Sequence, residues 1–201
     1  TTNGAQGITA LFENCFELEK TMTDSKKWSV RIADMVLARW PHLKPEWSHE
    51  YAVVLKGFED LWRVTGDKRY FDYIKTTIDD VLDADGKIHG YALEHYSLDH
   101  MNSGRQLFVL SEQTKDKRYE KAADMLREQY RSHPRNAKGG FWHKASLADQ
   151  MYMDGIYMGS VFYAEYAARH NDNAAFDDIA KQILILAEHA RDEKTGLYYH
   201  V

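Results

Sequence analysis

Two acidic residues in similar sequence settings are the first candidates for chemistry. Asp154 follows a segment rich in Met and Tyr and is expected in the first turns of a helix, and Asp99 holds the equivalent place earlier in the chain. If both helices face one pocket, burial would raise the pKa of Asp154 and let it hold a proton near neutral pH. A carboxylate pair is what general acid/base work on a glycoside needs. The alternative for Asp154 is an exposed first-turn residue that complements the helix dipole, and the alternative for Asp99 is a helix cap.

The segment at 139–144, Gly-Gly-Phe-Trp-His-Lys, supplies groups suited to binding a sugar acid. Its two glycines let the backbone turn tightly and approach a ligand. Trp142 offers a flat ring for stacking, while His143 and Lys144 offer donors for a carboxylate or for hydroxyl groups. The segment therefore indicates a polar, aromatic binding site next to Asp154.

Two further residues are weaker candidates for the same pocket. His200 ends another loop of glycine and aromatic residues, where it can position water or bind a substrate oxygen. Tyr51 opens a helix expected to lie in an inner layer, which would bring it to the same pocket. Core packing is the alternative interpretation of Tyr51.

Several other chemistries are excluded because their motifs are missing. The chain has no Gly-x-Gly-x-x-Gly, Walker, Gly-x-Ser-x-Gly or His-Glu-x-x-His sequence. Its ten His residues have neither Cys partners nor helical i, i+4 pairing, which argues against a zinc site. Residues 83–86, Asp-Ala-Asp-Gly, lack the Glu that a calcium loop needs at its twelfth place, so a turn is predicted there.

The composition is that of an ordinary globular protein. The 201 residues carry a formal charge of -5, with 44% hydrophobic and 28% charged residues, which excludes a disordered chain and permits one sizeable core. Lys and Arg are not gathered into one stripe, so no nucleic-acid partner is expected. The single Cys15 excludes an internal disulfide framework and any Cys-based metal site.

No targeting or membrane segment is visible. No apolar run approaches the roughly 20 residues of a membrane span, so no membrane partner is expected. The chain begins at Thr1 rather than Met, which leaves a processed start open. The compartment stays open between the periplasm and the cytoplasm of a bacterium, with the periplasm favoured.

An apolar period near 3.6 residues runs along most of the chain. Trp28, Ile32, Met35 and Val36 fit one helical face, and no convincing alternating strand is found. The pattern predicts an all-α fold. The expected helices lie near 8–22, 26–40, 47–65, 67–83, 99–114, 116–132, 148–170 and 173–191.

A repeat of about 50 residues organises these helices. Residues 65–70, Thr-Gly-Asp-Lys-Arg-Tyr, recur at 114–119 as Thr-Lys-Asp-Lys-Arg-Tyr, with a weaker copy at 171–176. In each copy the Asp is expected to cap a new helix. Each unit then consists of two helices joined by a short turn and followed by a longer loop rich in Gly and aromatic residues.

Stacked helical hairpins of this kind form an open solenoid or a closed double ring of helices. The long loops, at 84–98, 134–148 and 192–201, are expected to gather at one end of the stack, where sites are usually built on a rigid scaffold. The sequence predicts a single domain over 1–201 with a helical extension at 1–25. Its pocket is expected at the loop end.

Four blocks of sequence resemble a known enzyme family. They are His-Pro-Arg at 133–135, Gly-Gly-Phe-Trp-His-Lys at 139–144, Gln-Met-Tyr-Met-Asp-Gly-Ile-Tyr-Met at 150–158 and Thr-Gly-Leu-Tyr-Tyr-His at 195–200. Over roughly residues 26–201 the chain is similar to glycoside hydrolase family 105, the unsaturated rhamnogalacturonyl hydrolases. The related unsaturated glucuronyl hydrolases of family 88 share the fold and the chemistry. The resemblance implies an (α/α)6 barrel, a double ring of six helical hairpins.

The resemblance also implies a particular reaction on pectin fragments. Their terminal uronic acid carries a C4–C5 double bond left by a lyase. Asp154 would protonate C4 and then help deprotonate the water that attacks C5, after which the hemiketal opens and releases the remaining saccharide. Asp99 would bind sugar hydroxyls and adjust the proton affinity of Asp154, and His200 would lie near the attacked carbon and the water.

The same resemblance implies a binding site and a partner. Four residues would shape the subsite for the uronate: Trp142, His143, Lys144 and Tyr152. No metal or cofactor is expected, because an activated double bond requires only proton transfer and positioning. The expected partner is an oligosaccharide that ends in an unsaturated uronic acid.

This sequence departs from the family pattern in two ways. Tyr152 stands where the family pattern has Trp, which keeps a ring but alters stacking. A barrel of six hairpins needs about twelve helices, whereas this chain supplies roughly eight, so only the N-terminal part of the barrel is expected.

Three alternatives to a rhamnogalacturonan substrate stay open. One is an unsaturated glucuronyl hydrolase that acts on glycosaminoglycan or other lyase products. The second is a non-catalytic helical-repeat module that binds glycans or a protein. The third is a sugar epimerase on a similar double ring, which would rely on paired His and fits the Asp-centred blocks less well.

Overall fold

The computed structural model describes residues 27–200, and this part of the chain contains helices and no β-strand. The chain divides into two units, Thr1–Pro41 and His42–Val201. In the first unit, α2 spans Trp28–Arg39. The predicted helix at 8–22 and the helical extension at 1–25 lie outside the described residues. The all-α prediction is confirmed for the described range.

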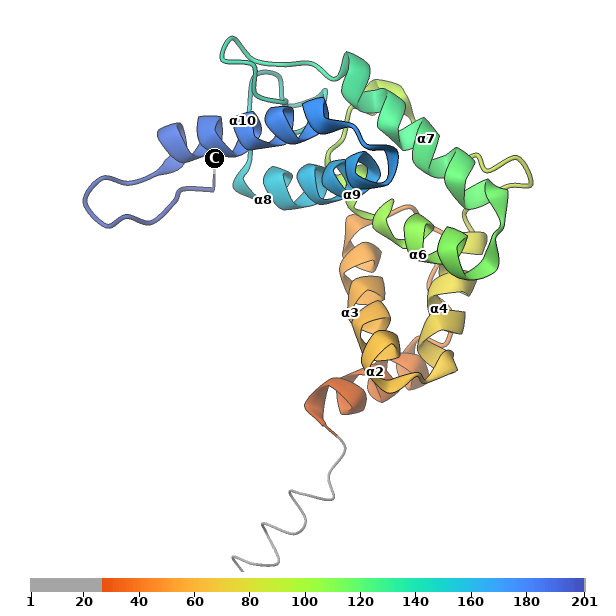
Figure 1. The fold of residues 1–201 in the computed structure, drawn as a ribbon. Coiled ribbons are helices and arrows are strands. Elements are labelled where there is room, and N and C mark those ends of the chain that lie inside the picture. Colours follow the sequence, from red (N-terminus) through yellow and green to blue (C-terminus); the bar gives the residue numbers. More distant parts are fainter. Residues whose placement is uncertain (1–26, 201) are drawn as a thin grey trace, which may run out of the picture. The chain divides into compact units, whose positions relative to one another are not determined.

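Three consecutive helical hairpins build the second unit (Figure 1). The first hairpin pairs α3 (His49–Thr65) with α4 (Lys68–Asp79). The second joins α5 (Asp99–Asn102) and α6 (Arg105–Thr114) to α7 (Lys117–Ser132). The third joins α8 (Met153–Gly155), the π-helix η2 (Ile156–Ser160) and α9 (Val161–His170) to α10 (Asn173–Ala190). A short 3-10 helix, η1 (Leu93–His95), precedes the second hairpin.

Three predicted helices differ from those observed by more than two residues. The helix expected at 67–83 ends at Asp79. The helix expected at 99–114 is interrupted at Ser103 and Gly104, where the backbone makes i→i+3 hydrogen bonds. The helix expected at 148–170 begins only at Met153. The preceding segment turns back on itself, because Asp149 has a positive φ and the Gln150 carbonyl accepts a hydrogen bond from an earlier loop residue.

The short turns of the three hairpins share one geometry, as the sequence repeat predicts. In each turn a residue with positive φ ends the first helix, and an Asp side chain accepts a hydrogen bond from the backbone at the start of the second. The positive-φ residues are Gly66, Lys115 and Asn171, and the caps are Asp67, Asp116 and Asp172. The predicted Asp caps are therefore confirmed in all three hairpins.

The long loops that follow the hairpins also repeat. Each begins with an isolated antiparallel β-bridge that closes a glycine-containing turn. The bridges pair Leu82 with Ile88, Arg135 with Phe141, and Arg191 with Tyr198. In the first of these turns the Asp83 side chain accepts hydrogen bonds from two backbone N–H groups, so the predicted turn at 83–86 is confirmed.

The hairpins form two layers in the second unit. The first helices of successive hairpins contact one another: α3 meets α5 and α6, and these meet η2 and α9. Each second helix packs against its own partner and against the next hairpin, as α4 does against α6 and α7 against α9 (Figure 1). This arrangement brings the first residues of the inner helices together.

Aromatic side chains fill the space between the layers. Tyr130 of α7 stacks on Tyr163 of α9 with ring centroids 4.3 Å apart, and its hydroxyl donates to the Gly159 carbonyl at 2.8 Å. Phe162 is fully buried and stacks on Phe108 of α6 at 5.3 Å. Large buried rings dominate core energetics, so these contacts set the register of one hairpin on the next.

No helix among residues 27–200 combines the length and the apolar character needed to cross a membrane.

Gly104 lies where the second and third hairpins approach closely and provides a test of this packing. A Cβ atom there would lie 2.6 Å from Phe162 and 2.7 Å from Leu126, both fully buried. Gly104→Ala should therefore lower the free energy of unfolding by about 1–3 kcal/mol. The matched control, Gly57→Ala, lies in α3 with no atom near the added methyl group and should raise it by up to about 1 kcal/mol. Equal effects of the two changes in urea unfolding would contradict the proposed packing.

Candidate active site

Asp99 and Asp154 begin corresponding inner helices. Asp99 is the first residue of α5, and Asp154 is the second residue of α8, which continues through η2 into α9. The capping positions are Leu98 and Tyr152, and neither of these makes a side-chain cap. Helix capping, the alternative interpretation of Asp99, therefore does not account for it. Asp154 lies in the first turn of its helix, as the helix-dipole interpretation of this residue requires.

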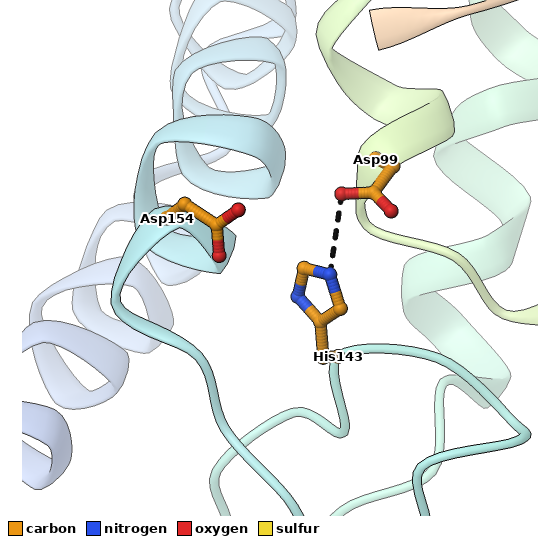
Figure 2. A group of neighbouring side chains, drawn as sticks. All are labelled: Asp99, His143 and Asp154. Carbon is orange, nitrogen blue, oxygen red and sulfur yellow. Dashed lines mark ion pairs between the residues drawn. The ribbon is translucent and has the colours of Figure 1, made fainter. Parts of the chain in front are cut away.

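His143 lies between the two carboxylates (Figure 2). Its Nε2 atom is 3.2 Å from Asp99 Oδ1, and the side chain is only 4% exposed. A ring nitrogen of His143 and one oxygen from each carboxylate all lie within 4.8 Å of one another. The backbone is held at both ends, because the His143 N–H donates to the Gln150 carbonyl at 2.7 Å and its carbonyl accepts from Leu98 at 3.0 Å. The loop is thereby attached to the start of α5.

Tyr152 and His200 complete the cluster on the side of Asp154. The Tyr152 ring stacks on His143 with centroids 4.6 Å apart, and His200 meets Tyr152 edge-on at 5.2 Å. His200 Nε2 is 3.9 Å from Asp154 Oδ1. The Met153 N–H donates to the His200 carbonyl at 2.7 Å, which attaches the third long loop to the start of α8.

The surroundings of Asp99 favour its charged form. Burial raises the pKa of Asp99, but the hydrogen bond from His143 and the charges of His143, His49 and Lys144 act in the opposite direction. The result is a pKa below the ordinary value. Asp99 is therefore a carboxylate at neutral pH and can only accept hydrogen bonds.

Asp154 is less enclosed than the sequence led us to expect. Its side chain is 40% exposed, so the predicted burial is only partial. Its Oδ1 atom is nonetheless buried and makes no hydrogen bond within the described part of the chain. A buried oxygen without a partner is costly in a folded protein, and such groups often belong to functional sites.

A second layer of hydrogen bonds supports the loop that carries His143. His133 Nε2 lies 2.8 Å from the Trp142 carbonyl, and its Nδ1 lies 3.2 Å from Gln129 Nε2. Tyr91 donates to the Gln129 side-chain carbonyl at 3.2 Å. Burial lowers the pKa of His133 to about 4, and the hydrogen bond to the Trp142 carbonyl offsets this only in part. His133 is a neutral structural residue.

The two glycines of this loop, Gly139 and Gly140, are required by the conformation and packing of the loop. Gly139 adopts a φ of 90°, which ordinary side chains rarely tolerate. A Cβ atom on Gly140 would lie 2.1 Å from the sulfur of Met151. The predicted close approach is therefore to Met151 rather than to an open pocket.

A cavity of about 520 Å³ lies beside Asp99. Its walls come from the start of α3, from the segment between η1 and α5, and from residues 144–146. Lys144 lines it, so one predicted binding residue shares this space with Asp99. The other lining residues include Trp47, His49, His95 and His100. Its volume is typical of a small-molecule site.

Tyr51 and Trp142 do not line this cavity. Tyr51 lies on the first turn of α3, and it reinforces the effect of burial in raising the pKa of Tyr73 on α4. Trp142 donates its indole hydrogen bond to Asp149 at 3.2 Å. Their roles in substrate binding stay predictions.

Three histidines of the cavity were missed by the sequence analysis: His49, His95 and His100. The signal for His49 was present, because Ser48 caps α3 and places the neighbouring residues at the loop end of an inner helix. His100 directly follows Asp99; burial lowers its pKa, and the Asp99 charge opposes this effect.

A metal ion can also be considered at this site. Within residues 27–200, the side chains whose ligand atoms lie close enough together are Asp99, His143 and Asp154. The hydrogen bond between His143 and Asp99 by itself explains why these two side chains are adjacent. A metal is therefore not needed to account for the arrangement, and the expectation of a metal-free site stays a prediction.

Comparison with known proteins identifies the class to which this helical fold and its carboxylate pair belong. Residues 22–201 match the family described as Glycosyl Hydrolase Family 88, and the chain belongs to that family. The match covers the three hairpins and all the candidate residues. A solved glycoside hydrolase of family 105 from C. acetobutylicum is 40% identical with a TM-score of 0.83, over 87% of this chain and 49% of that chain. The predicted relationship to family 105, related to family 88, is confirmed.

More distant structures support the fold alone. A possible family 105 member from Salmonella enterica is 22% identical with a TM-score of 0.66, over 77% of this chain and 40% of that one. A family 88 glycosyl hydrolase from Bacteroides vulgatus is 15% identical with a TM-score of 0.61, over 86% and 51%. The chain therefore spans about half the length of the solved structures that it matches, and its fold corresponds to part of their helical barrel.

Because His133 is buried and neutral in the folded chain, it should make the free energy of unfolding depend on pH. The unfolded chain takes up a proton near the ordinary histidine pKa of 6.5, whereas the folded chain does so only near pH 4. The free energy of unfolding should therefore fall by on the order of 3 kcal/mol as the pH drops from 6.5 to about 4. His133→Gln, which cannot titrate, should make the free energy of unfolding less dependent on pH in this window.

Urea unfolding at several pH values measures this effect. His189→Gln is the control, because His189 is an exposed histidine on α10 and should keep the wild-type pH dependence. An unchanged slope in His133→Gln would show that His133 is not held neutral by the fold.

Proposed function

We propose that the complete protein removes 4,5-unsaturated galacturonic acid from the non-reducing end of rhamnogalacturonan oligosaccharides. The observation that carries this proposal is the meeting of Asp99 and Asp154 around His143, with His200 beside Asp154. These residues come from three separate loop and helix junctions. Membership of a glycosyl hydrolase family and 40% identity to a family 105 enzyme support a carbohydrate substrate and this choice of family.

In the proposed reaction, Asp154 is the acid/base. Its carboxylic acid gives a proton to C4 of the vinyl ether, and positive charge develops at C5 and the ring oxygen. Water then adds to C5 and returns a proton to Asp154, which restores the acid. The hemiketal at C5 opens, the former ring oxygen stays on C1, and C1 expels the saccharide as an alcohol. One water molecule is consumed for each saccharide released.

The other residues take supporting roles in this proposal. Asp99, held as a carboxylate, accepts hydrogen bonds from sugar hydroxyls at the edge of the cavity. Lys144 lines the same cavity and offers a positive charge to the substrate carboxylate. His200, which is exposed and 3.9 Å from Asp154, positions the attacking water. Trp142 and Tyr152 provide the ring surfaces near the uronate.

The alternative is an unsaturated glucuronyl hydrolase, which the family 88 match favours. The terminal unsaturated sugar is the same in both substrates, because the elimination removes the C4 configuration in which galacturonate and glucuronate differ. The two substrates differ in the saccharide released, not in the bond that reacts. Parallel assays with unsaturated rhamnogalacturonan fragments and unsaturated glucuronyl disaccharides separate them. The preferred substrate is the one with the higher kcat/KM.

Neutralising the acid provides the test of the mechanism. Asp154→Asn in the complete protein should lower kcat by about 10²–10⁴-fold, because the amide cannot donate the proton to C4. Loss of the ultraviolet absorbance of the double bond measures the rate. Asp72→Asn is the matched control, the same chemical change on an exposed part of α4, and should keep wild-type activity. If Asp154→Asn turns over substrate as fast as the wild type, the mechanism is wrong. If the wild-type protein binds the oligosaccharide without turnover, a glycan-binding module is favoured.

A further inference from the structure

The proposed reaction leaves the buried ring of His143 without a direct role. The resemblance suggested a contact with the uronate, but the ring is only 4% exposed and lies beneath Tyr152. Like Asp154, it is not part of the cavity lining, but unlike the partly exposed Asp154 it offers almost no surface to a substrate. The ring therefore acts on its neighbours rather than on the substrate.

We propose that His143 is a positioning residue that links Asp99 to Asp154 and holds the proton of the acid in place. The proposal rests on the function proposed above and deepens the account of the same site. Asp99 anchors one ring nitrogen, and the other nitrogen is offered to Asp154. The two carboxylates then act as one unit although they begin different helices.

The hydrogen bond to Asp99 determines which ring nitrogen carries the proton. A carboxylate only accepts, so the hydrogen in the 3.2 Å contact belongs to Nε2 of His143. In a neutral ring Nδ1 is then an acceptor. Nδ1 is buried and has no hydrogen-bond partner among the described residues. Figure 2 shows this nitrogen on the side of the ring that faces Asp154.

The helix that carries Asp154 leaves room at this nitrogen. Gly155 follows the acid, and a Cβ atom there would lie 3.1 Å from Nδ1 of His143. Any side chain would crowd the buried acceptor. The backbone of α8 thus passes close to the ring and leaves Nδ1 open toward the carboxyl group of Asp154.

An empty acceptor next to an acid favours the acid in its protonated form. The O–H of Asp154 can donate to Nδ1, whereas a carboxylate offers that nitrogen nothing. A ring nitrogen of His143 and a carboxyl oxygen of Asp154 lie within 4.8 Å of each other, and rotation of the partly exposed Asp154 side chain would bring its O–H to Nδ1. Once C4 has taken the proton, the carboxylate is released from Nδ1 and turns to the attacking water.

Other charged groups surround this link and contribute to its pH dependence. Asp99 approaches from α5 and Asp154 from α8. His49 of α3 and Lys144 add positive charge near Asp99, and His200 lies beside Asp154. Substitutions must therefore distinguish loss of the link from a general change of charge.

Two variants of His143 separate the two halves of the link. The amide nitrogen of His143→Gln takes the place of Nε2, so this variant keeps the donor to Asp99 and loses the acceptor. The amide oxygen of His143→Asn takes the place of Nδ1, so this variant keeps an acceptor and loses the donor. Each should lower kcat by about 10- to 100-fold with little change in KM, the loss expected for one hydrogen bond to a charged group.

The pH profile distinguishes this role from packing. His143→Gln, which lacks the acceptor, should move the high-pH limb of the kcat profile to lower pH, because Asp154 loses its proton more readily. His143→Asn keeps an acceptor and should move this limb less. Combining His143→Gln with Asp99→Asn should cost little more than either change alone, since the groups act as a unit. His189→Gln is the control, the same change at an exposed histidine of α10, and it should leave the kcat pH profile unchanged.

A wild-type pH profile in both His143 variants would overturn the proposal. So would a raised KM at unchanged kcat, which would identify His143 as a substrate contact. A wild type that consumes no unsaturated uronide would instead reject the proposed function.

Nitrogen NMR of the histidine rings in the complete protein tests the link without activity. We expect the Nε2–H form of His143 and a change in its Nδ1 signal in Asp154→Asn. An Nδ1 signal that responds to Asp99→Asn but not to Asp154→Asn would contradict the link, whatever the enzyme acts on.

Discussion

The attachment of one loop residue to the start of a neighbouring helix underlies the whole site. His143 accepts a backbone hydrogen bond from Leu98 and donates a side-chain hydrogen bond to Asp99. These two bonds attach the second long loop to the start of α5. Because both are made by one buried residue, the loop can move relative to α5 only by breaking them. The position of Asp154 relative to Asp99 follows from this constraint.

The repeat supplies the scaffold for this constraint. Each hairpin turns at an Asp cap, and each long loop closes with a β-bridge, so successive units present equivalent positions at the same end. Asp99 and Asp154 occupy such positions on neighbouring inner helices. Because the units repeat, the two carboxylates lie at equivalent positions of neighbouring units. The non-repeated residues, His143 and His200, then give the two acids different surroundings.

The helices and the repeat could be predicted from the sequence because they depend on local signals. The periodic apolar residues and the Asp caps at 67, 116 and 172 act within a few residues of chain. The start of the last inner helix was wrong by five residues, because Asp149 and Gln150 are held by contacts with a distant loop residue. The burial of His143 and the positions of His95 and His100 in the cavity also depend on contacts between loops, which no local pattern encodes. The family resemblance supplied roles for the acids but not this geometry.

The most direct test of the central claim is the fate of hydrogen at C4. The complete protein should be given an unsaturated uronide in deuterated water, and the early product followed by proton NMR. If Asp154 protonates the double bond, one deuterium enters C4 from a single face, before any slower exchange with solvent. The saccharide is released only with this addition. Release of a free uronic acid that still carries its double bond, without deuterium at C4, would contradict the account.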